Sequence, residues 1–514
     1  MTARKGGLVA LARAVAERPK GSRNDHLLWA TMRAVEEDYA TADIVSTLTP
    51  AALESGLDAP EVRATIRSGV AKAEREGKRG RLVDESPALD GLAAYEAAMA
   101  DPIKRAELER LIAQVEADLA AEARADGLTA EERLASCVET FREWLHFPDP
   151  SVLYIVLAAM VANEVREDDP VWPLIVGSPG SGKTEVLASI SGQPNVYQAA
   201  TMTEPALLSG TSKRERSKTS KGGLLRQVGA FGILVLKDFG SVLSMAQESR
   251  GQMLAALREI YDGSWTRQVG TDGGQELHWE GKLGLLAGCT PAIDSHHAVM
   301  GSMGERFVLY RVPTTENDDR EQVRRSLERT GDHAMRRALA EAVSPVLAAA
   351  RGMEMPATAD PELREWLVEL STFAVRCRSA VERDYRTREI ELIPPPEMPA
   401  RLGLVLWRVF RALRVLGVTE PEARRLLAKM ALDSMPAARR AVLEELRRAG
   451  DELMLSRIAD NIHYPKTTAR RALEDLNAHG VVERDSGPTG RADVWWLSDW
   501  TRDRLAAIWP GDGQ

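Results

Sequence analysis

The stretch from Pro173 to Ile190, "PLIVGSPGSGKTEVLASI", decides the fold class. Its apolar start is typical of a buried strand, and "TEVLASI" has the pattern of a helix start. The turn between them, "GSPGSGKT", matches the pattern G-x-x-x-x-G-K-[ST] of a phosphate-binding loop. Because strand, turn and helix occur in this order, the alternative of a simple glycine-rich turn is disfavoured. The predicted loop consists of Gly177, Ser178, Pro179, Gly180, Ser181, Gly182, Lys183 and Thr184.

Each part of this loop suits a bound nucleotide. The glycines allow backbone N–H groups to surround phosphates, and the helix N-terminus adds partial positive charge. We expect Lys183 to neutralise the β- and γ-phosphates of ATP and the hydroxyl of Thr184 to bind Mg²⁺. ATP and Mg²⁺ are therefore the predicted cofactors.

A second apolar run, "ILVLKDFG" (233–240), leads to Asp238. We expect this strand to lie beside the phosphate loop, where the carboxylate can hold Mg²⁺ through water. The alternative is an acid that merely caps a buried strand at the surface. The next residue is Phe239, which cannot act as the general base of a hydrolysing ATPase. Glu185 and Glu259 are the nearest acids in sequence that can replace such a base.

Two later segments carry further candidate catalytic residues. The run "LGLLAG" (283–288) leads to Thr290, whose hydroxyl can face the γ-phosphate or the attacking water, or simply mark the strand exit. In "GERF" (304–307), Arg306 precedes an apolar strand and can stabilise charge on the ATP of a neighbouring subunit. An exposed loop arginine is the alternative.

Composition limits the class of protein. The chain has 514 residues, 44% hydrophobic and 28% charged, which fits several soluble globular domains. It has no apolar run of 18 residues, so we expect no membrane span. The N-terminal apolar stretch is interrupted by charges and lacks a clear cleavage site, unlike a signal peptide. The three cysteines have no metal-type spacing, so a reducing cytoplasm is the simplest location.

Pattern changes along the chain divide it into five parts. The predicted fold class is multidomain α/β, with a parallel sheet flanked by helical regions and a C-terminal winged helix. The expected parts are a helical domain at 1–80, a helical linker region at 81–150, the phosphate-loop core at 151–315, a helical lid at 316–435 and a winged helix at 436–514.

The net charge of −9 disfavours a protein that coats nucleic acid, but it permits local basic patches. One such run lies between the phosphate-loop helix and Asp238. We assign it to DNA binding, with a solvated loop as the alternative. A predicted hairpin, "WTRQVG" and "QELHWEG" around "TDGG", adds Arg267. The candidate residues of the run are Lys213, Arg214, Arg216, Lys218 and Lys221.

The last 75 residues predict a winged helix. Two helical segments precede "PKTTARRALEDLNAHGVV", a third helix that begins after Pro465, and two strands flank "DSGPTGRAD". In such domains the third helix enters the major groove with its N-terminal residues at the bases. A protein-binding role is the alternative. The residues assigned to DNA are Lys466, Thr467, Thr468, Arg470 and Arg471, with Arg491 near the wing tip on backbone phosphate.

Residues from about 171 to 435 resemble the AAA+ ATPases, and most closely the minichromosome maintenance-like helicases, in the order of their motifs and in the strands and helices around each motif. The segments that carry the resemblance are the phosphate loop, "GILVLKDF", the hairpin with "LGLLAGCTP", "MGERF" and "EMPARLGLVLWRVFRAL". The resemblance implies a ring of six subunits, in which Arg306 serves the neighbour's ATP and Arg401 is the sensor-2 arginine. A helix-start arginine in solvent is the alternative for Arg401.

The N-terminal segment 21–69 resembles the helical domain that follows the catalytic part of phage and mobile-element primase-polymerases. This resemblance implies a primase as a possible partner, although no paired-acid palm precedes the segment here. Together the two resemblances imply an ATP-dependent DNA translocase or helicase that acts on single-stranded or duplex DNA in replication of a phage or mobile element.

Three departures from the family pattern keep other functions open. Phe239 stands where the family has a glutamate, Thr290 where it has an asparagine, and Asp272 at the hairpin tip where a DNA-contacting residue is common. A slowly hydrolysing, ATP-gated DNA-binding switch, such as an initiator or helicase loader, is one alternative. An interaction ATPase in anti-phage defence, whose winged helix binds protein, is another.

Overall fold

The computed structural model describes residues 4–16, 23–37, 39, 41–75, 127–209, 223–269, 275–297, 306–313, 316–328, 331–384, 386–485 and 493–508. Two compact units make up the chain. The first contains residues 1–129, 192–196 and 344–353, and the second contains 130–191, 197–343 and 354–514.

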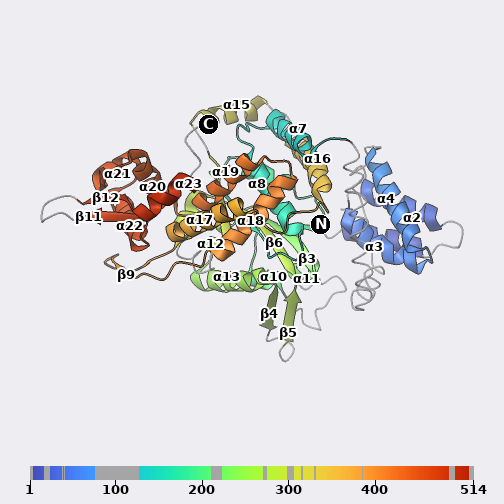
Figure 1. The fold of residues 1–514 in the computed structure, drawn as a ribbon. Coiled ribbons are helices and arrows are strands. Elements are labelled where there is room, and N and C mark those ends of the chain that lie inside the picture. Colours follow the sequence, from blue (N-terminus) through green and yellow to red (C-terminus); the bar gives the residue numbers. More distant parts are fainter. Residues whose placement is uncertain are drawn as a thin grey trace. The chain divides into compact units, whose positions relative to one another are not determined.

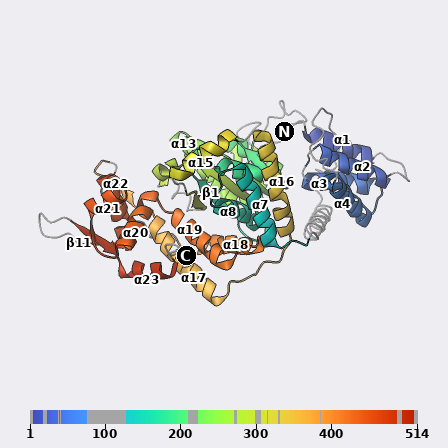
Figure 2. The same cartoon turned by 90° about the horizontal axis from the view of Figure 1, so that it is seen from above.

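Four helices form the N-terminal part of the first unit (Figure 2). They are α1 (Arg4–Ala16), α2 (Arg23–Glu36), α3 (Thr41–Glu54) and α4 (Ala59–Arg75). Apolar side chains at helical spacing, among them Leu27, Ile44 and Ile66, are fully buried in their common core. The helical pattern predicted for this region is confirmed.

A five-stranded parallel sheet organises the second unit (Figure 1). Its strand order is β2-β3-β6-β1-β7, and the three apolar runs found in the sequence form β1, β3 and β6. The strands are β1 (Trp172–Val176), β2 (Val196–Ala199), β3 (Phe231–Leu236), β6 (Lys282–Cys289) and β7 (Phe307–Arg311). The predicted mixed α/β class with a parallel sheet is confirmed.

Strand β6 lies between β1 and β3 and pairs with both. The strand before Asp238 is therefore not the sheet neighbour of β1, although the segment after it reaches the same edge as the phosphate loop, where the charge of Asp238 acts on Lys183. Sequence patterns identify strands but not their neighbours, because pairing order depends on how the connecting helices cross the sheet. β6 comes last of the three in the chain but takes the middle place.

Helices bury both faces of this sheet. Helix α8 (Ser151–Glu164) is buried around nearly its whole circumference, as its apolar sequence predicts. Its Asn163 side chain bonds the backbone N–H and C=O of Val171, which fixes the entry into β1. The other helices of this region are α7 (Ala130–Trp144), α9 (Lys183–Ser189), α10 (Glu204–Leu207), α11 (Leu224–Val228), α12 (Gly240–Leu243), α13 (Gln247–Tyr261) and the 3₁₀ helix η2 (Pro291–His296).

The predicted hairpin is present as β4 (Ser264–Val269) and β5 (Gln275–Glu280), and it projects from the sheet region in Figure 1. Trp265 pairs with Trp279 across the two strands, and both indoles are buried against the core. Such aromatic cross-strand pairs stabilise a hairpin and hold it to its base.

The region after β7 is helical, as its sequence predicts, with one addition. Its helices are α15 (Glu316–Glu328), α16 (Asp332–Ala350), α17 (Pro361–Arg378), α18 (Ala400–Val415) and α19 (Glu420–Asp433). A short ribbon of β8 (Glu382–Arg383) and β9 (Ile390–Leu392), absent from the sequence-based prediction, precedes the proline-rich segment.

The C-terminal segment forms a winged helix. Its elements are α20 (Ala437–Ala449), β10 (Leu453–Met454), α21 (Leu455–Asn461), α22 (Lys466–Ala478), β11 (Val482–Asp485), β12 (Val494–Leu497) and α23 (Asp499–Ile508). Trp495 is buried, and Trp496 points outward to bond Glu483. The two adjacent tryptophans therefore point to opposite faces of one strand.

The winged helix packs on the helical region rather than standing apart. The Trp500 indole stacks on Phe373 of α17 with ring centres 6.0 Å apart, and Arg376 lies 4.2 Å over the same indole. Arg504 also pairs with Glu369 of α17 at 2.7 Å. In the described part of the chain, no helix is long and apolar enough to span a bilayer.

Candidate nucleotide and DNA sites

The carboxyl ends of three strands meet at the candidate nucleotide site. The N–H of Gly177 donates to the carbonyl of Cys289 at 3.1 Å, which ties the loop after β1 to the end of β6. The N–H of Phe239 donates to the carbonyl of Gly288 at 2.7 Å, which ties the segment after β3 to β6. Lys183, Asp238 and Thr290 therefore lie at one edge of the sheet, where parallel α/β folds bind ligands.

The glycines of the loop are required by its backbone path. Gly180 and Gly182 have φ of +87° and +77°, a region that other L-residues rarely adopt. At Gly177, a Cβ would come within 2.5 Å of the Ser181 hydroxyl. The Ser181 Oγ is itself buried and has no hydrogen-bond partner among the described residues, so it is available to a group held in the loop.

Lys183 lies inside this loop, and its ammonium donates to the carbonyl of Ser178 at 3.0 Å. Burial lowers the pKa of Lys183, and the nearby charge of Asp238 partly opposes this effect. A desolvated ammonium with one backbone partner is poised to gain from an anionic ligand, because a phosphate would restore the lost solvation.

The oxygens present fit a magnesium ion. Thr184 and Asp238 are both exposed at the strand ends, and Asp238 uses one carboxylate oxygen to accept from the N–H of Gly240 at 2.9 Å. No group of three or more His, Cys, Asp or Glu side chains capable of holding a metal occurs in the described ranges. This sparse oxygen set suits Mg²⁺, which keeps several waters and takes other ligands from phosphates.

Phe239 points away from this edge into the core. It is fully buried, and its ring packs on Phe307 with ring centres 5.1 Å apart. The position after Asp238 is therefore a packing position in this chain. The side chain there contributes to stability and does not face a nucleotide.

The two acids considered as replacements lie in different settings. Glu185 forms a two-point ion pair with Arg336 of α16, at 3.0 and 3.1 Å. Glu259 is exposed on α13.

The phosphate loop also contacts α15, because Gln322 donates to the carbonyl of Gly180. Neither Arg336 nor Gln322 was identified from the sequence, because no local pattern links them to a loop more than 140 residues away.

Thr290 is half-buried directly after β6 and begins helix η2. Its neighbour Cys289 is buried, and burial together with the charge of Asp238 raises the pKa of this thiol to about 11. The hydroxyl of Thr290 makes no capping hydrogen bond to the backbone of η2. Its predicted function toward the γ-phosphate stays a prediction.

Arg306 lies at the opposite edge of the sheet. β7 runs parallel to β1 with Trp172 opposite Phe307 and Val176 opposite Arg311, so Arg306 and Gly177 lie at opposite ends of paired strands. Five residues of strand separate them by roughly 16 Å. The Arg306 guanidinium pairs with Asp262 at 2.5 Å and lies over the ring of Tyr261.

Arg401 begins α18 and lies 3.7 Å from Glu397. Burial raises the pKa of Tyr261 to about 12, and the positive charges of Arg408, Arg401 and Arg306 partly oppose this. The two arginines assigned to catalysis therefore act on one common side chain, while Lys183, Asp238 and Thr290 form a separate group.

The described DNA-binding candidates fall into two groups. On α22, Lys466, Thr467, Arg470 and Arg471 are exposed and Thr468 is half-buried. Arg267 instead anchors the hairpin, because its guanidinium donates to Glu204 at 2.6 Å and to the carbonyl of Leu208 at 2.9 Å. Its role in DNA binding stays a prediction. The basic run 213–221, the hairpin tip with Asp272, and Arg491 lie outside the described residues.

Comparison with known proteins supports the C-terminal domain. The family model of the IclR helix-turn-helix domain matches residues 441–486, which span most of α20 to the end of β11. The chain therefore carries a helix-turn-helix domain of this kind at its C-terminal end. No curated protein matches the chain.

Two solved structures are similar at low sequence identity. One is the apo form of the NrS-1 C-terminal region, with 10% identity, a TM-score of 0.25, and coverage of 71% of this chain and 76% of that one. The other is JCV helicase bound to a thiazolopyridine compound, with 13% identity, a TM-score of 0.23, and coverage of 68% and 86%. At these TM-scores neither likeness enters the functional argument.

Proposed function

We propose that this protein is an ATP-dependent DNA translocase or helicase of the AAA+ type that works as a hexameric ring in replication of a phage or mobile element. The observation that carries the proposal is the loop of Gly177 to Thr184, with its buried lysine, positive-φ glycines and unpartnered Ser181 hydroxyl. This arrangement suits a polyphosphate held by backbone N–H groups and one ammonium.

Thr184 and Asp238 would hold Mg²⁺, which would neutralise charge on the β- and γ-phosphates. Lys183 would bind the same phosphates, and the ammonium would exchange the carbonyl of Ser178 for a phosphate oxygen. Thr290 would orient a water or the γ-phosphate from the end of β6. These residues of a single chain would bind the phosphates and Mg²⁺ and would orient the attacking water.

The ring assembly is supported by the position of Arg306. A single chain keeps this guanidinium at the far edge of the sheet from its own phosphate loop. In a head-to-tail ring, the Arg306 edge of one subunit faces the loop edge of the next, so each ATP would lie between two subunits. Arg306 would then leave Asp262 and bind the neighbour's nucleotide.

The slow, ATP-gated DNA-binding switch is a second candidate, and the burial of Phe239 favours it. The side chain after Asp238 lies in the core and cannot polarise water. Glu185 is already paired with Arg336, so it would have to break a two-point ion pair to act as a base. A motor needs rapid hydrolysis, whereas a switch needs only binding and slow release.

Steady-state ATP turnover by the purified protein tests the proposal, measured without DNA, with single-stranded DNA and with duplex DNA. For the motor we expect DNA to stimulate turnover at least about tenfold, a change of about 1.4 kcal/mol in the barrier. Lys183→Ala should lose turnover, and Lys72→Ala, an exposed lysine of α4, is the matched control.

Tight ATP binding with negligible turnover in all three conditions would favour the switch instead. Equal turnover by wild type and Lys183→Ala would contradict the assignment of the nucleotide site itself.

A further inference from the structure

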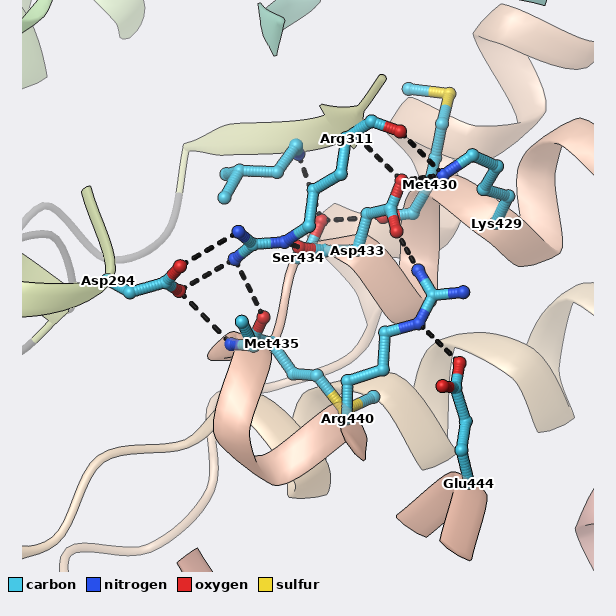
Figure 3. A network of polar contacts seen from close by, with 11 residues as sticks. Asp294, Arg311, Lys429, Met430, Asp433, Ser434, Met435, Arg440 and Glu444 are labelled. Carbon is cyan, nitrogen blue, oxygen red and sulfur yellow. Dashed lines mark hydrogen bonds and ion pairs between the residues drawn. The ribbon is translucent and has the colours of Figure 1, made fainter. Parts of the chain in front are cut away.

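A polar network around the fully buried Asp433 joins the edge of the sheet near Thr290 to the first helix of the winged helix (Figure 3). It contains Asp294 on η2, Arg311 at the end of β7, Asp433 at the end of α19 and Arg440 on α20. We refer to these four residues as the relay. None of the four belongs to a motif recognised in the sequence.

The relay starts at the nucleotide edge. Thr290 directly precedes η2 and Asp294 lies within this short helix, so only a short stretch of backbone connects the two residues. The neighbouring Ile293 is buried in the core and its N–H donates to the carbonyl of Thr290 at 3.2 Å. A displacement of Thr290 on nucleotide binding therefore displaces Asp294.

Arg311 receives this displacement through two parallel bonds. Its guanidinium donates to both carboxylate oxygens of Asp294, at 2.9 and 2.7 Å. The residue after it, Val312, donates its N–H to the carbonyl of Val176 at 2.8 Å, directly before the phosphate loop. The end of β7 is thus linked to η2, which follows β6, and to the end of β1, both at the edge where the nucleotide would bind.

The next step crosses from the sheet to α19. Both the backbone N–H and the guanidinium of Arg311 bond Asp433, the first to the carboxylate at 2.7 Å and the second to the carbonyl at 3.0 Å. The Asp433 side chain is fully buried, and Lys429 donates to it at 2.6 Å and to the carbonyl of Arg311 at 2.7 Å.

Arg440 completes the path to the winged helix. Its guanidinium pairs with Asp433 and with Glu444, while the first N–H of α20, from Ala437, donates to Asp294 at 3.1 Å. Helix α20 then bonds α22 through Arg439 and Asp475 at 3.0 Å. The contacts of α20 with Asp294, Asp433 and Asp475 all come from its first turn, and Figure 3 shows the contact with Asp433.

We propose that the relay couples the nucleotide edge to the winged helix, so that DNA bound at α22 changes ATP turnover and bound ATP changes the affinity for DNA. Asp294 and Arg311 are positioning residues that act through Thr290. The inference rests on the proposed function, because it requires ATP at the loop and DNA at α22. The Asp433 carboxylate at the centre of the relay is fully buried, so breaking one of its pairs leaves a buried charge short of a partner and favours discrete arrangements over intermediate ones.

The coupling can be measured on the full chain as two ratios. One compares ATP turnover with and without a duplex, and the other compares the Kd for a labelled duplex without nucleotide and with ATP. Thermodynamic linkage requires the binding effects to be reciprocal, and coupled sites typically give ratios of about 5 to 150. Arg440→Gln and Asp294→Asn should each bring both ratios close to one.

The double variant should lose at least as much coupling as either single variant, because Asp294 also contacts α20 directly through the N–H of Ala437. Arg440→Lys keeps a positive charge opposite Asp433 and should restore part of the coupling. It also serves as the second variant if Arg440→Gln fails to fold, as judged by its melting transition. Arg504→Gln, which breaks the separate ion pair between α23 and Glu369, is the matched control and should keep both ratios.

Wild-type ratios in Arg440→Gln and Asp294→Asn would overturn the relay. The same loss of coupling in Arg504→Gln would also overturn it, because any loosening of the winged helix would then suffice. If the wild-type protein binds ATP and DNA but both ratios equal one, the relay is contradicted and the proposed function is not. A wild type that binds neither ligand contradicts the proposed function, and the relay with it.

Discussion

Single side chains show how similar sequence positions acquire different roles. Lys183 is buried in the loop, and its ammonium donates to the carbonyl of Ser178 rather than to a carboxylate of the described residues, which suits the phosphate binding proposed for it. Phe239 occupies the position where the resemblance leads one to expect a catalytic glutamate, but its ring packs against Phe307. The tertiary environment, more than the place in a motif, determines what each residue contributes.

Substitution of Phe239 tests its packing role. Phe239→Ala should lower the free energy of unfolding by about 3–5 kcal/mol, because it removes a fully buried ring. Phe239→Glu should also destabilise the protein and should not increase ATP turnover, because a buried carboxylate without a partner is costly. Thermal melting and ATP turnover of both variants provide the measurement, with Phe239→Leu as the milder control. Faster turnover in Phe239→Glu would show that this position reaches the nucleotide.

Lys429 makes stability depend on pH. Burial, followed by the charges of Arg440 and other neighbours, lowers the pKa of Lys429 to about 7. The unfolded chain then holds more protons at this position between about pH 7 and the ordinary lysine pKa near 10.4, so its contribution to stability increases as pH rises through this window.

We therefore expect the melting temperature of wild type to rise relative to that of Lys429→Met between pH 7 and pH 9, corresponding to about 1–2 kcal/mol. Working below pH 9 limits the opposing effect of cysteines, whose pKa values burial raises. Parallel melting curves of the two proteins across this range would show that Lys429 stays charged in the folded state.

At the scale of elements, the two ends of helix α22 have different surroundings. Its N-terminal residues are exposed, whereas Glu474 and Asp475 hold Arg383 of the β8–β9 ribbon at 3.0 and 2.6 Å. The ribbon therefore contacts the C-terminal half of the helix and leaves the first turns accessible. This arrangement suits a recognition helix whose N-terminal end enters a major groove.

Removal of the exposed charges of α22 should weaken duplex binding. The triple variant Lys466→Ala, Arg470→Ala and Arg471→Ala should bind duplex DNA about 10–100-fold more weakly at moderate salt. The slope of log K against log salt should also fall by about one for each lost phosphate contact. The melting temperature should stay the same because the residues are exposed. Arg502→Ala on α23 is the control, and unchanged affinity in the triple variant would indicate a protein-binding winged helix.

At the scale of the whole molecule, the proposed ring predicts that active sites are shared. Arg306→Ala and Asp238→Ala should each be nearly inactive, because they damage different halves of one site. An equal mixture should recover roughly a quarter of wild-type turnover, since random assembly leaves about one interface in four with both partners intact. A mixture of Lys183→Ala and Asp238→Ala is the control, because both changes lie in the same half. Equal turnover in the two mixtures would remove the support for shared sites.

The sequence predicted the local parts of the fold well. The strands around the phosphate loop, the hairpin, the helical regions and the winged helix all follow from short-range patterns of apolar residues, glycines and prolines. The middle position of β6 and the β8–β9 ribbon were not predicted. Those features depend on which segments meet after the chain folds, and such contacts have no short-range pattern.

The sequence by itself determined the backbone path of the loop, because the positive φ angles at Gly180 and Gly182 require glycine, whereas phosphate binding there stays a prediction. It also determined the helix-turn-helix domain, whose helices follow from local periodicity. Only the tertiary structure decided that Phe239 is a core residue, that Arg306 lies across the sheet from Lys183, and that Arg311 joins η2 to α19. The physical reason is that burial and pairing arise between residues distant in the chain, so they depend on packing that no single segment contains.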